Sequence, residues 1–243
     1  LHGGSLDLVT TDTAAAAFVF DNAMTGTGVL NVILSHEASQ FSFDTVDVKA
    51  GGAFTGKAAI QSGTFLFSTE DKVSTASGVL SEGILELGKA NGLAGSALLD
   101  DDYKIGGLTM NRGTLKVATG AGGAPEGSLT VEKLDVGGGG TVAVDIPSSI
   151  TSGAATGTLF DDAVSPIDKY QIQLVQATGS PTPAHGAQLT LTNFDGTATG
   201  DPNSLNKVVQ LQNGSGTEVA EAYYSYIVSV MGNKAEGASS ENG

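Results

Sequence analysis

The stretch that decides the fold is Gly127-Ser-Leu-Thr-Val-Glu-Lys-Leu-Asp-Val-Gly, followed shortly by Gly140-Thr-Val-Ala-Val. In both segments apolar residues alternate with polar or small ones after a glycine, which is the two-residue period of a β-strand. The glycine run Gly137 to Gly140 between them has no strand–turn–helix context, so we interpret it as a turn and not as a dinucleotide site. The stretch therefore predicts two short strands joined by a glycine-rich turn.

The same pattern recurs along most of the chain. Further copies are Gly4-Ser-Leu-Asp-Leu, Gly28-Val-Leu-Asn-Val-Ile-Leu, Gly63-Thr-Phe-Leu-Phe, Gly83-Ile-Leu-Glu-Leu and Gly113-Thr-Leu-Lys-Val. Their uneven spacing is not that of a propeller or a leucine-rich array, and short strands without helical periodicity leave a sandwich, a barrel or a parallel β-helix. We favour a parallel β-helix, with three short strands and about 20 to 25 residues per coil, because this fold tolerates insertions at its turns.

Alternation also predicts which side chains of the deciding stretch face the core. The residues expected to point inward are Leu129, Val131, Leu134, Val136, Val142 and Val144.

Composition limits the partners of the chain. Of the 243 residues 40% are apolar, which argues against disorder. The 11 basic and 26 acidic residues give a formal net charge of −15, which repels phosphate backbones. We therefore expect no nucleic-acid partner.

Cysteine is absent, which excludes disulfides, thiolate metal sites and cysteine catalysis within the sequence. The longest apolar run, Ala14 to Phe20, is far shorter than the roughly 20 residues that span a bilayer. The sequence begins with Leu1 and shows no basic segment followed by an apolar stretch, so we interpret it as an excised piece whose targeting signal has been removed.

The composition changes after residue 146, where we place a domain boundary. Five of the six prolines lie beyond this point, and turn residues dominate 147–165. Alternating strands then resume, with Asp195-Gly196 and Asn213-Gly214 where hairpin turns are expected. We expect β-helix coils over 1–146, an antiparallel β cap over 147–232 and a frayed polar tail over 233–243.

Two stretches approach the phosphate-binding loop motif, from Gly51 to Ala58 and from Gly83 to Ala90. Alanine stands in both where the magnesium-binding hydroxyl is needed, and no helix pattern follows. We therefore expect neither to bind phosphate.

The remaining polar motifs also predict no cofactor or metal site. His2, His36 and His185 lack the spacing of a zinc site, and no Gly-x-Ser-x-Gly segment of a serine hydrolase occurs. Asn213-Gly214-Ser215 matches a glycosylation sequon, but we favour a tight turn there.

Acidic and aromatic clusters remain as candidates. The run Asp100 to Asp102 has enough carboxylates for calcium but not the spacing of a calcium loop, so we favour a solvated turn. Cleft-lining carboxylates of a β-helical enzyme remain an alternative role, for which the candidates are Asp44, Asp47, Glu70 and Asp71. For Tyr223, Tyr224 and Tyr226 we favour core packing over a ligand platform.

The chain resembles the C-terminal end of an autotransporter passenger of the pertactin or AIDA kind. The resemblance is carried by the glycine-led strands from Gly127 and Gly140, by Asp168-Lys-Tyr-Gln-Ile-Gln-Leu-Val and by Tyr224-Ser-Tyr-Ile-Val-Ser-Val. It implies a right-handed parallel β-helix, type V secretion to the surface of a Gram-negative bacterium, and a C-terminal autochaperone. The sequence departs from the family in having no Arg-Gly-Asp motif and no Gly-Asp-Ser-Gly protease signature.

We expect a non-catalytic stalk or adhesin with an autochaperone, located at the cell surface or secreted. The partners implied by the resemblance are a host cell surface or extracellular matrix, other bacterial cells through self-association, and an outer-membrane translocator barrel in the full-length chain. A β-helical carbohydrate-active enzyme and a phage or secreted fibre remain the alternatives.

Overall fold

The computed structural model describes residues 3–22, 24–44, 53–89, 94–119, 126–144, 149–151, 175–178, 189–193, 204–212 and 218–227. These residues are almost entirely β-strands and turns, and their helical content is one 3-10 turn, η2 (Thr69–Asp71). None of the described helical residues forms a helix that is long and apolar enough to cross a membrane.

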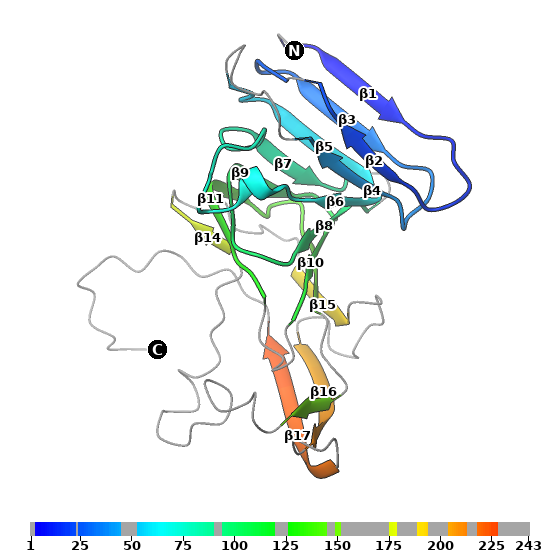
Figure 1. The fold of residues 1–243 in the computed structure, drawn as a ribbon, viewed down its shortest axis with the longest axis vertical. Helices are drawn as coiled ribbons and strands as arrows, with labels where there is room; N and C mark the ends of the chain where they lie inside the picture. Colours follow the sequence, from blue (N-terminus) through cyan, green and yellow to red (C-terminus); the bar gives the residue numbers. More distant parts are fainter. Residues whose placement is uncertain are drawn as a thin grey trace, which may run out of the picture.

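Two seven-stranded parallel sheets form the body of the molecule (Figure 1). Sheet A contains, in spatial order, β1 (Ser5–Val9), β3 (Val29–Ile33), β5 (Lys57–Ser62), β7 (Ile84–Leu87), β9 (Tyr103–Met110), β11 (Leu129–Asp135) and β14 (Val175–Ala177). Sheet B contains β2 (Ala17–Phe20), β4 (Gln40–Phe43), β6 (Thr64–Leu66), β8 (Ser96–Leu99), β10 (Thr114–Val117), β12 (Gly140–Val144) and β15 (Leu189–Asn193). Because strands alternate between the sheets along the sequence, the chain winds as a β-solenoid, and the expected parallel β-helix is confirmed.

A small third sheet lies at the opposite end of the molecule from β1 (Figure 1). It contains β13 (Ser149–Thr151), β16 (Ser204–Gln212) and β17 (Glu218–Ile227). Strands β16 and β17 pair in antiparallel fashion, as expected for the C-terminal region, whereas β13 pairs with β16 in parallel. Asn213 and Gly214, where we expect the hairpin turn, lie outside the described residues.

The second expected hairpin, at Asp195-Gly196, does not form between its flanking strands. Strand β15 pairs in parallel with β12 in sheet B, and β16 belongs to the third sheet. An Asp-Gly pair is only a local turn signal, whereas the edge of β12 offers β15 a full ladder of backbone partners. Strands β14 and β15 thus extend the solenoid within 147–232, and the domain division at residue 146 stays a prediction.

All seven glycine-led segments are strands, and their uneven spacing has a simple cause. Four of them, β1, β3, β7 and β11, lie in sheet A, and three, β6, β10 and β12, lie in sheet B. The intervening strands begin without the glycine pattern. Even between register partners on adjacent strands of one sheet the separation varies. It is 24 residues from Ser5 to Val29 and 28 from Val29 to Lys57 in sheet A, but 32 from Thr64 to Ser96 and 18 from Ser96 to Thr114 in sheet B, so the turns between strands differ in length.

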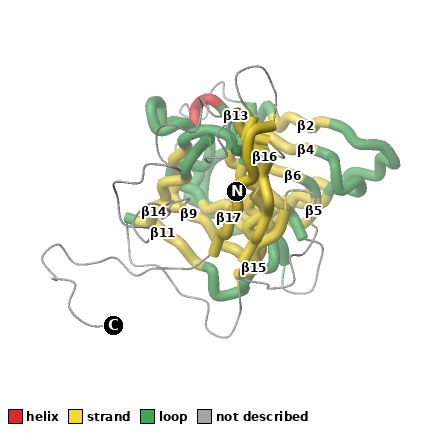
Figure 2. Tube along the Cα trace, turned by 90° about the horizontal axis from the view of Figure 1, so that it is seen from below, coloured by secondary structure: helices red, strands yellow, loops and turns green. Residues whose placement is uncertain are grey.

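Each coil contributes two strands to these sheets and not the three that we expect from sequence. A third side exists only in part. Gly26 and Phe54 form an isolated parallel bridge on it, and the first residues of β9 and β11 pair there with each other. Strand β14 pairs only with that part of β11, from Leu129 to Val131. Seen along the longest axis, β9, β11 and β14 lie on one side of the molecule and β2, β4 and β6 on the other (Figure 2).

The core lies between the sheets, and its register confirms most of the expected inward positions. Leu129 and Val131 are fully buried, and Val136, Val142 and Val144 are nearly so. Leu134 is only partly buried and packs against the edge of the core. Alternation predicts the face on which Leu134 lies but not how completely its neighbours cover it.

A row of aromatic rings runs through the solenoid. Phe41 contacts both Phe43 and Phe65 with ring centroids 5.2 and 6.4 Å apart, and Phe65 contacts Phe67 at 5.1 Å. Phe67 stacks on Tyr103 at 4.5 Å, with an interplanar angle of 18°. Edge-to-face and stacked pairs of this kind add to the stability that the buried area supplies.

Candidate functional site

The acidic run Asp100 to Asp102 forms a corner between β8 and β9. Lys72, from the loop that follows η2, lies against this corner, and the backbone N–H of Val73 donates to the carbonyl of Asp102 at 3.0 Å. The next coil approaches from the other side through Ser128. The corner therefore joins three consecutive parts of the solenoid.

Each of the three carboxylates has a different partner. The Tyr103 hydroxyl donates to Asp100 at 2.7 Å, and the Lys72 ammonium donates to Asp101 in an ion pair. Asp102 accepts from both the backbone N–H and the hydroxyl of Ser128, at 2.9 and 2.7 Å. In the described part of the chain no group of three or more His, Asp or Glu side chains is arranged to hold a metal ion. The corner is thus a hydrogen-bonded junction between coils.

The ionisation of this corner follows from those contacts. The hydrogen bond from Lys72 lowers the pKa of Asp101, and the same bond raises the pKa of Lys72. Burial, followed by the hydrogen bond to Asp100, raises the pKa of the Tyr103 hydroxyl. At neutral pH the corner therefore holds an ion pair beside a neutral tyrosine.

Asp71 is the most unusual ionisable group in the described residues. The residue is 2% exposed, and one carboxylate oxygen, Oδ2, accepts from the backbone N–H and the hydroxyl of Ser68 at 2.9 and 2.8 Å. The other oxygen, Oδ1, is buried without a hydrogen-bond partner. Burial raises the pKa of Asp71 because it penalises the charged form.

The three candidate cleft carboxylates that lie within the described residues, Asp44, Glu70 and Asp71, occupy two separate places in the fold. Asp71 caps η2 through Ser68, and Glu70 beside it accepts from the Thr69 hydroxyl at 2.6 Å. Asp44 follows β4 on a different coil, and its backbone N–H donates to the carbonyl of Phe20. Asp47 lies outside the described residues. The spacing of Ser68 and Asp71 is itself a capping signal for a local turn, one that we did not identify from the sequence.

The described parts of the two phosphate-loop-like stretches, 53–58 and 83–89, are strands and turns, as we expected for the second of them. Lys57 begins β5 and its ammonium pairs with Glu86 at 2.7 Å, on the outer surface of sheet A. Residues Ile84–Leu87 form β7, and Gly88 turns the chain with a φ of +82°. The first stretch continues into β5, whereas residues 90–93, at the end of the second stretch and beyond it, lie outside the described residues.

Among the histidines, only His36 lies within the described residues. It belongs to a turn, where its Nδ1 accepts from the backbone N–H of Ala38 at 3.2 Å. The positions of His2 and His185 lie outside the described residues, as does the sequon at Asn213. The three tyrosines considered for a ligand platform lie on β17, where Tyr223 is in register with Val208, Tyr224 with Lys207 and Tyr226 with Leu205.

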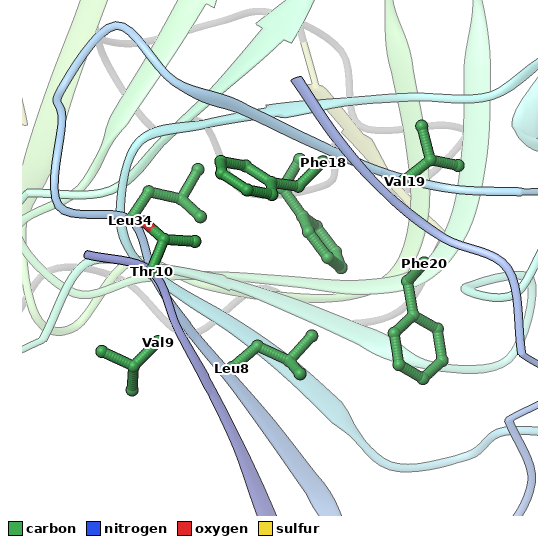
Figure 3. A pocket seen from close by; sticks show the side chains of 8 residues that line it. Leu8, Val9, Thr10, Phe18, Val19, Phe20 and Leu34 are labelled. Atoms are coloured by element: carbon green, nitrogen blue, oxygen red, sulfur yellow. The ribbon is translucent and has the colours of Figure 1, made fainter. Parts of the chain in front are cut away.

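A cavity of about 240 Å³ opens at the N-terminal end of the solenoid. Its lining is almost wholly apolar and comes from the two terminal strands, β1 and β2, and from the coil below them. The residues that line it are Leu8, Val9, Thr10, Phe18, Val19, Phe20, Leu34 and Phe41 (Figure 3). We did not expect this cavity from the sequence, because alternation marks Leu8, Phe18 and Phe20 as inward-facing without saying that a terminal coil leaves one side of them uncovered.

Comparison with known proteins gives one distant relative. No family model matches the chain, and no solved structure matches it. The chain is 26% identical over 239 residues to the uncharacterized lipoprotein YdeK of Escherichia coli (strain K12). This similarity covers 92% of the chain but 17% of the relative, so the chain spans less than a fifth of that protein's length.

Proposed function

We propose that the chain is a non-catalytic segment of a long β-solenoid protein of the Gram-negative cell envelope, of the autotransporter passenger type. In this proposal the coils act as a stalk or adhesive surface, and the C-terminal region seeds folding of the passenger during secretion. The observation that carries the proposal is the continuous stacking of parallel coils, in which each coil buries its apolar face against the next.

The polar groups of the solenoid support a structural role. Asp101 and Asp102 of the acidic corner, and Glu86 on sheet A, are used in contacts that tie one coil to another. The relative is named a lipoprotein, which supports an envelope location for a protein built around such a segment. No observation among the described residues favours the carbohydrate-active enzyme over this role.

The folding role is supported by the position of the C-terminal strands. A solenoid end exposes unpaired backbone groups and apolar side chains, so the element that covers it is a natural starting point for coil stacking. Strands β14 and β15 pair with β11 and β12 at that end, and the antiparallel pair β16–β17 follows them. Under the same proposal the partners are a host surface or matrix, neighbouring bacterial cells, and an outer-membrane translocator barrel.

Deletion in the full-length polypeptide tests this proposal. Removal of residues 147–232 is expected to leave the passenger unfolded and protease-sensitive at the cell surface, whereas removal of the tail 233–243 serves as the control and leaves it resistant. The readout is resistance of the surface-exposed passenger to added protease on intact cells. A passenger that is displayed and resistant after removal of 147–232 contradicts the folding role, and a full-length chain that never reaches the surface contradicts the location.

A further inference from the structure

We infer that the N-terminal end of the solenoid is a docking surface for one further parallel coil, which stacks on β1 and β2, fills the apolar cavity between them and places a hydrogen-bond donor on Asp7. This end is the face formed by Leu6, Asp7, Leu8, Phe18 and Phe20. The inference deepens the proposed function, since it rests on the chain being a segment of a longer solenoid, but it concerns a different end of the molecule.

In sheet A the burial of inward-facing side chains decreases from β3 to β1. Leu6 is in register with Leu30, and Leu8 with Val32, so the four residues occupy equivalent inward positions on adjacent coils. Leu30 and Val32 are fully buried, whereas Leu6 is 39% exposed and Leu8 is only partly buried. Apolar side chains at inward positions become fully buried in this fold only when a coil lies on each side of them.

In sheet B the burial of inward-facing side chains likewise decreases from β4 to β2, at the same end of the solenoid. Phe18 pairs in register with Phe41, and Phe20 with Phe43. Phe41 and Phe43 are 2% and 4% exposed, whereas Phe18 and Phe20 are partly buried and face the cavity (Figure 3). The aromatic row of the core therefore ends on rings that one more coil would cover.

The volume and the position of the cavity favour a coil over a small ligand. Its volume of about 240 Å³ is below the roughly 300 to 1,000 Å³ of sites that enclose small molecules. It lies between the outermost strands of both sheets, β1 and β2, which stand at the ends of the strand order. Outermost strands present unpaired backbone N–H and C=O groups, which a parallel strand can pair.

A polar ladder on the outer face of sheet A specifies the chemistry of that coil. Gln61 Nε2 donates to Asn31 Oδ1 at 3.0 Å, and Asn31 Nδ2 donates to Asp7 Oδ1 at 2.7 Å. The ladder thus runs toward the N-terminal end and finishes on a carboxylate, which can only accept when ionised. The residue stacked on Asp7 is therefore a donor, such as Asn, Gln, Lys or Ser.

The same carboxylate disfavours a second copy of the chain as the occupant. Two copies related by a two-fold axis would pair β1 with β1 in antiparallel fashion, and Asp7 is the central residue of this strand. Centred pairing would place the two Asp7 carboxylates opposite each other, and like charges at that position destabilise a sheet. The net charge of −15 adds a general repulsion between copies.

A chain with one added coil tests the inference. A copy of residues 5–28 is inserted between Gly4 and Ser5. The last residue of the copy, its Gly28, then directly precedes β1, just as the original Gly28 directly precedes β3. Its length matches the 24-residue separation of Asp7 and Asn31 on adjacent coils. In the favoured version the copy carries Asn in place of Asp7. The thermal midpoint Tm of the purified chain is expected to rise by about 4 °C or more.

Two matched insertions separate the apolar and polar parts of the docking surface. A copy that retains Asp7 is expected to raise Tm less than the Asn version, and the difference shrinks at high salt because the two carboxylates repel. A copy with Phe18→Ser and Phe20→Ser is expected not to raise Tm. Equal Tm values for the Asn version and the double-serine version would overturn the inference.

Sedimentation of the unmodified chain completes the test. We expect a monomer, since the occupant is a coil and not a second copy. A stable dimer that disappears in the chain with the added Asn coil would identify a second copy as the occupant and overturn the inference. These experiments use the purified chain, so their failure is distinct from failure of the folding role, which is measured on cells after removal of residues 147–232.

Discussion

Gly95 lies so close to Ile60 on the preceding coil that a Cβ atom placed on Gly95 would be 1.8 Å from the Ile60 carbonyl oxygen. Gly56 stands in the same relation to the backbone of Gly28, at 2.1 Å. Glycines at the starts of strands thus permit close stacking of one coil on the next.

Substitution of Gly95 tests this role of the glycine pattern. Gly95→Ala is expected to lower the free energy of unfolding by about 1 to 3 kcal/mol, because the backbone of the neighbouring coil must move. The matched control is Gly4→Ala, since nothing lies within 4 Å of a Cβ at Gly4. Urea unfolding followed by circular dichroism measures both variants. A loss of equal size in the two variants would contradict the role of stacking.

Leu108 and Leu134 give a second comparison, because they are register partners on β9 and β11 with different burial. Leu108 is 1% exposed, whereas Leu134 is partly buried at the edge of the core. We expect Leu108→Ala to cost about 2 to 5 kcal/mol and Leu134→Ala to cost clearly less. Chemical denaturation at one temperature compares the two variants, and a larger loss for Leu134→Ala would show that the register is wrong.

Much of the solenoid was predictable because its strands follow one local rule. Alternation after glycine correctly predicted seven strands and five of six inward positions near Val131, since burial on one face depends only on the two-residue period. The two-strand coil was not predictable, because β2 and β4 begin without a glycine, and Gly95 before β8 is followed by Ser-Ala-Leu-Leu, which does not alternate. Pairing of β15 with β12 depends on an edge that exists only in the folded molecule.

Asp71 gives the chain a stability that depends on pH. Burial raises its pKa above the ordinary value of 3.8, so the folded state holds this proton more tightly than the unfolded state does. The stability that the chain gains by holding this proton is therefore fully present below pH 3.8. It is lost as the pH rises through the folded-state pKa of Asp71. We expect Asp71→Asn to stabilise the chain at pH 7 by about 1 kcal/mol, since no buried charge remains.

The pH profile of that variant is the decisive measurement. The difference in unfolding free energy between Asp71→Asn and the unmodified chain should shrink as the pH falls toward about 4, the ordinary range of an aspartate pKa. Asp71→Ala is the control, because it removes the acceptor of both Ser68 hydrogen bonds and should destabilise the chain at every pH. A difference that grows toward acid would show that Asp71 is not held in a raised-pKa state.

Arg112 adopts a left-handed backbone conformation, with a φ of 66°, in the turn between β9 and β10. This conformation costs a residue with a Cβ about 1 to 2 kcal/mol. Glycine avoids that cost but loses roughly 0.5 to 1 kcal/mol more chain entropy on folding, which is the smaller effect. We expect Arg112→Gly to raise the free energy of unfolding by up to about 1 kcal/mol. Arg112→Ala removes the same side chain without relieving the backbone, so a gain in both variants would assign the effect to the guanidinium.

The candidate sites were harder to predict than the fold, for a physical reason. The run Asp100 to Asp102 is visible in the sequence, but its partners Lys72 and Ser128 come from adjacent coils. Whether carboxylates converge on a cation or separate toward different donors depends on those coils. The apolar cavity at β1 and β2 is likewise a property of a strand's place in the stack and has no local signature.

Three chains, residues 1–243, 1–193 and 1–146, test the contribution of the C-terminal end to stability and folding. Strand β14 pairs with Leu129 to Val131, and β15 pairs with the whole of β12, so truncation at 146 uncovers the last strands of both sheets. We expect the 1–146 chain to melt at least about 4 °C lower than the full chain, to refold more slowly and to be cut faster by protease. The 1–193 chain keeps β14 and β15 but lacks the antiparallel pair β16–β17, so its melting point separates the contribution of the final coil from that of the hairpin. An intermediate melting point of the 1–193 chain would assign part of the stability to the final coil and part to the hairpin.

The folding role depends on contacts between neighbouring coils. Repeat stability is a sum of such contacts, so a terminal unit can template coils only by stabilising the coil next to it. If the 1–146 chain folds as fast and melts as high as the whole chain, the C-terminal region does not seed the solenoid.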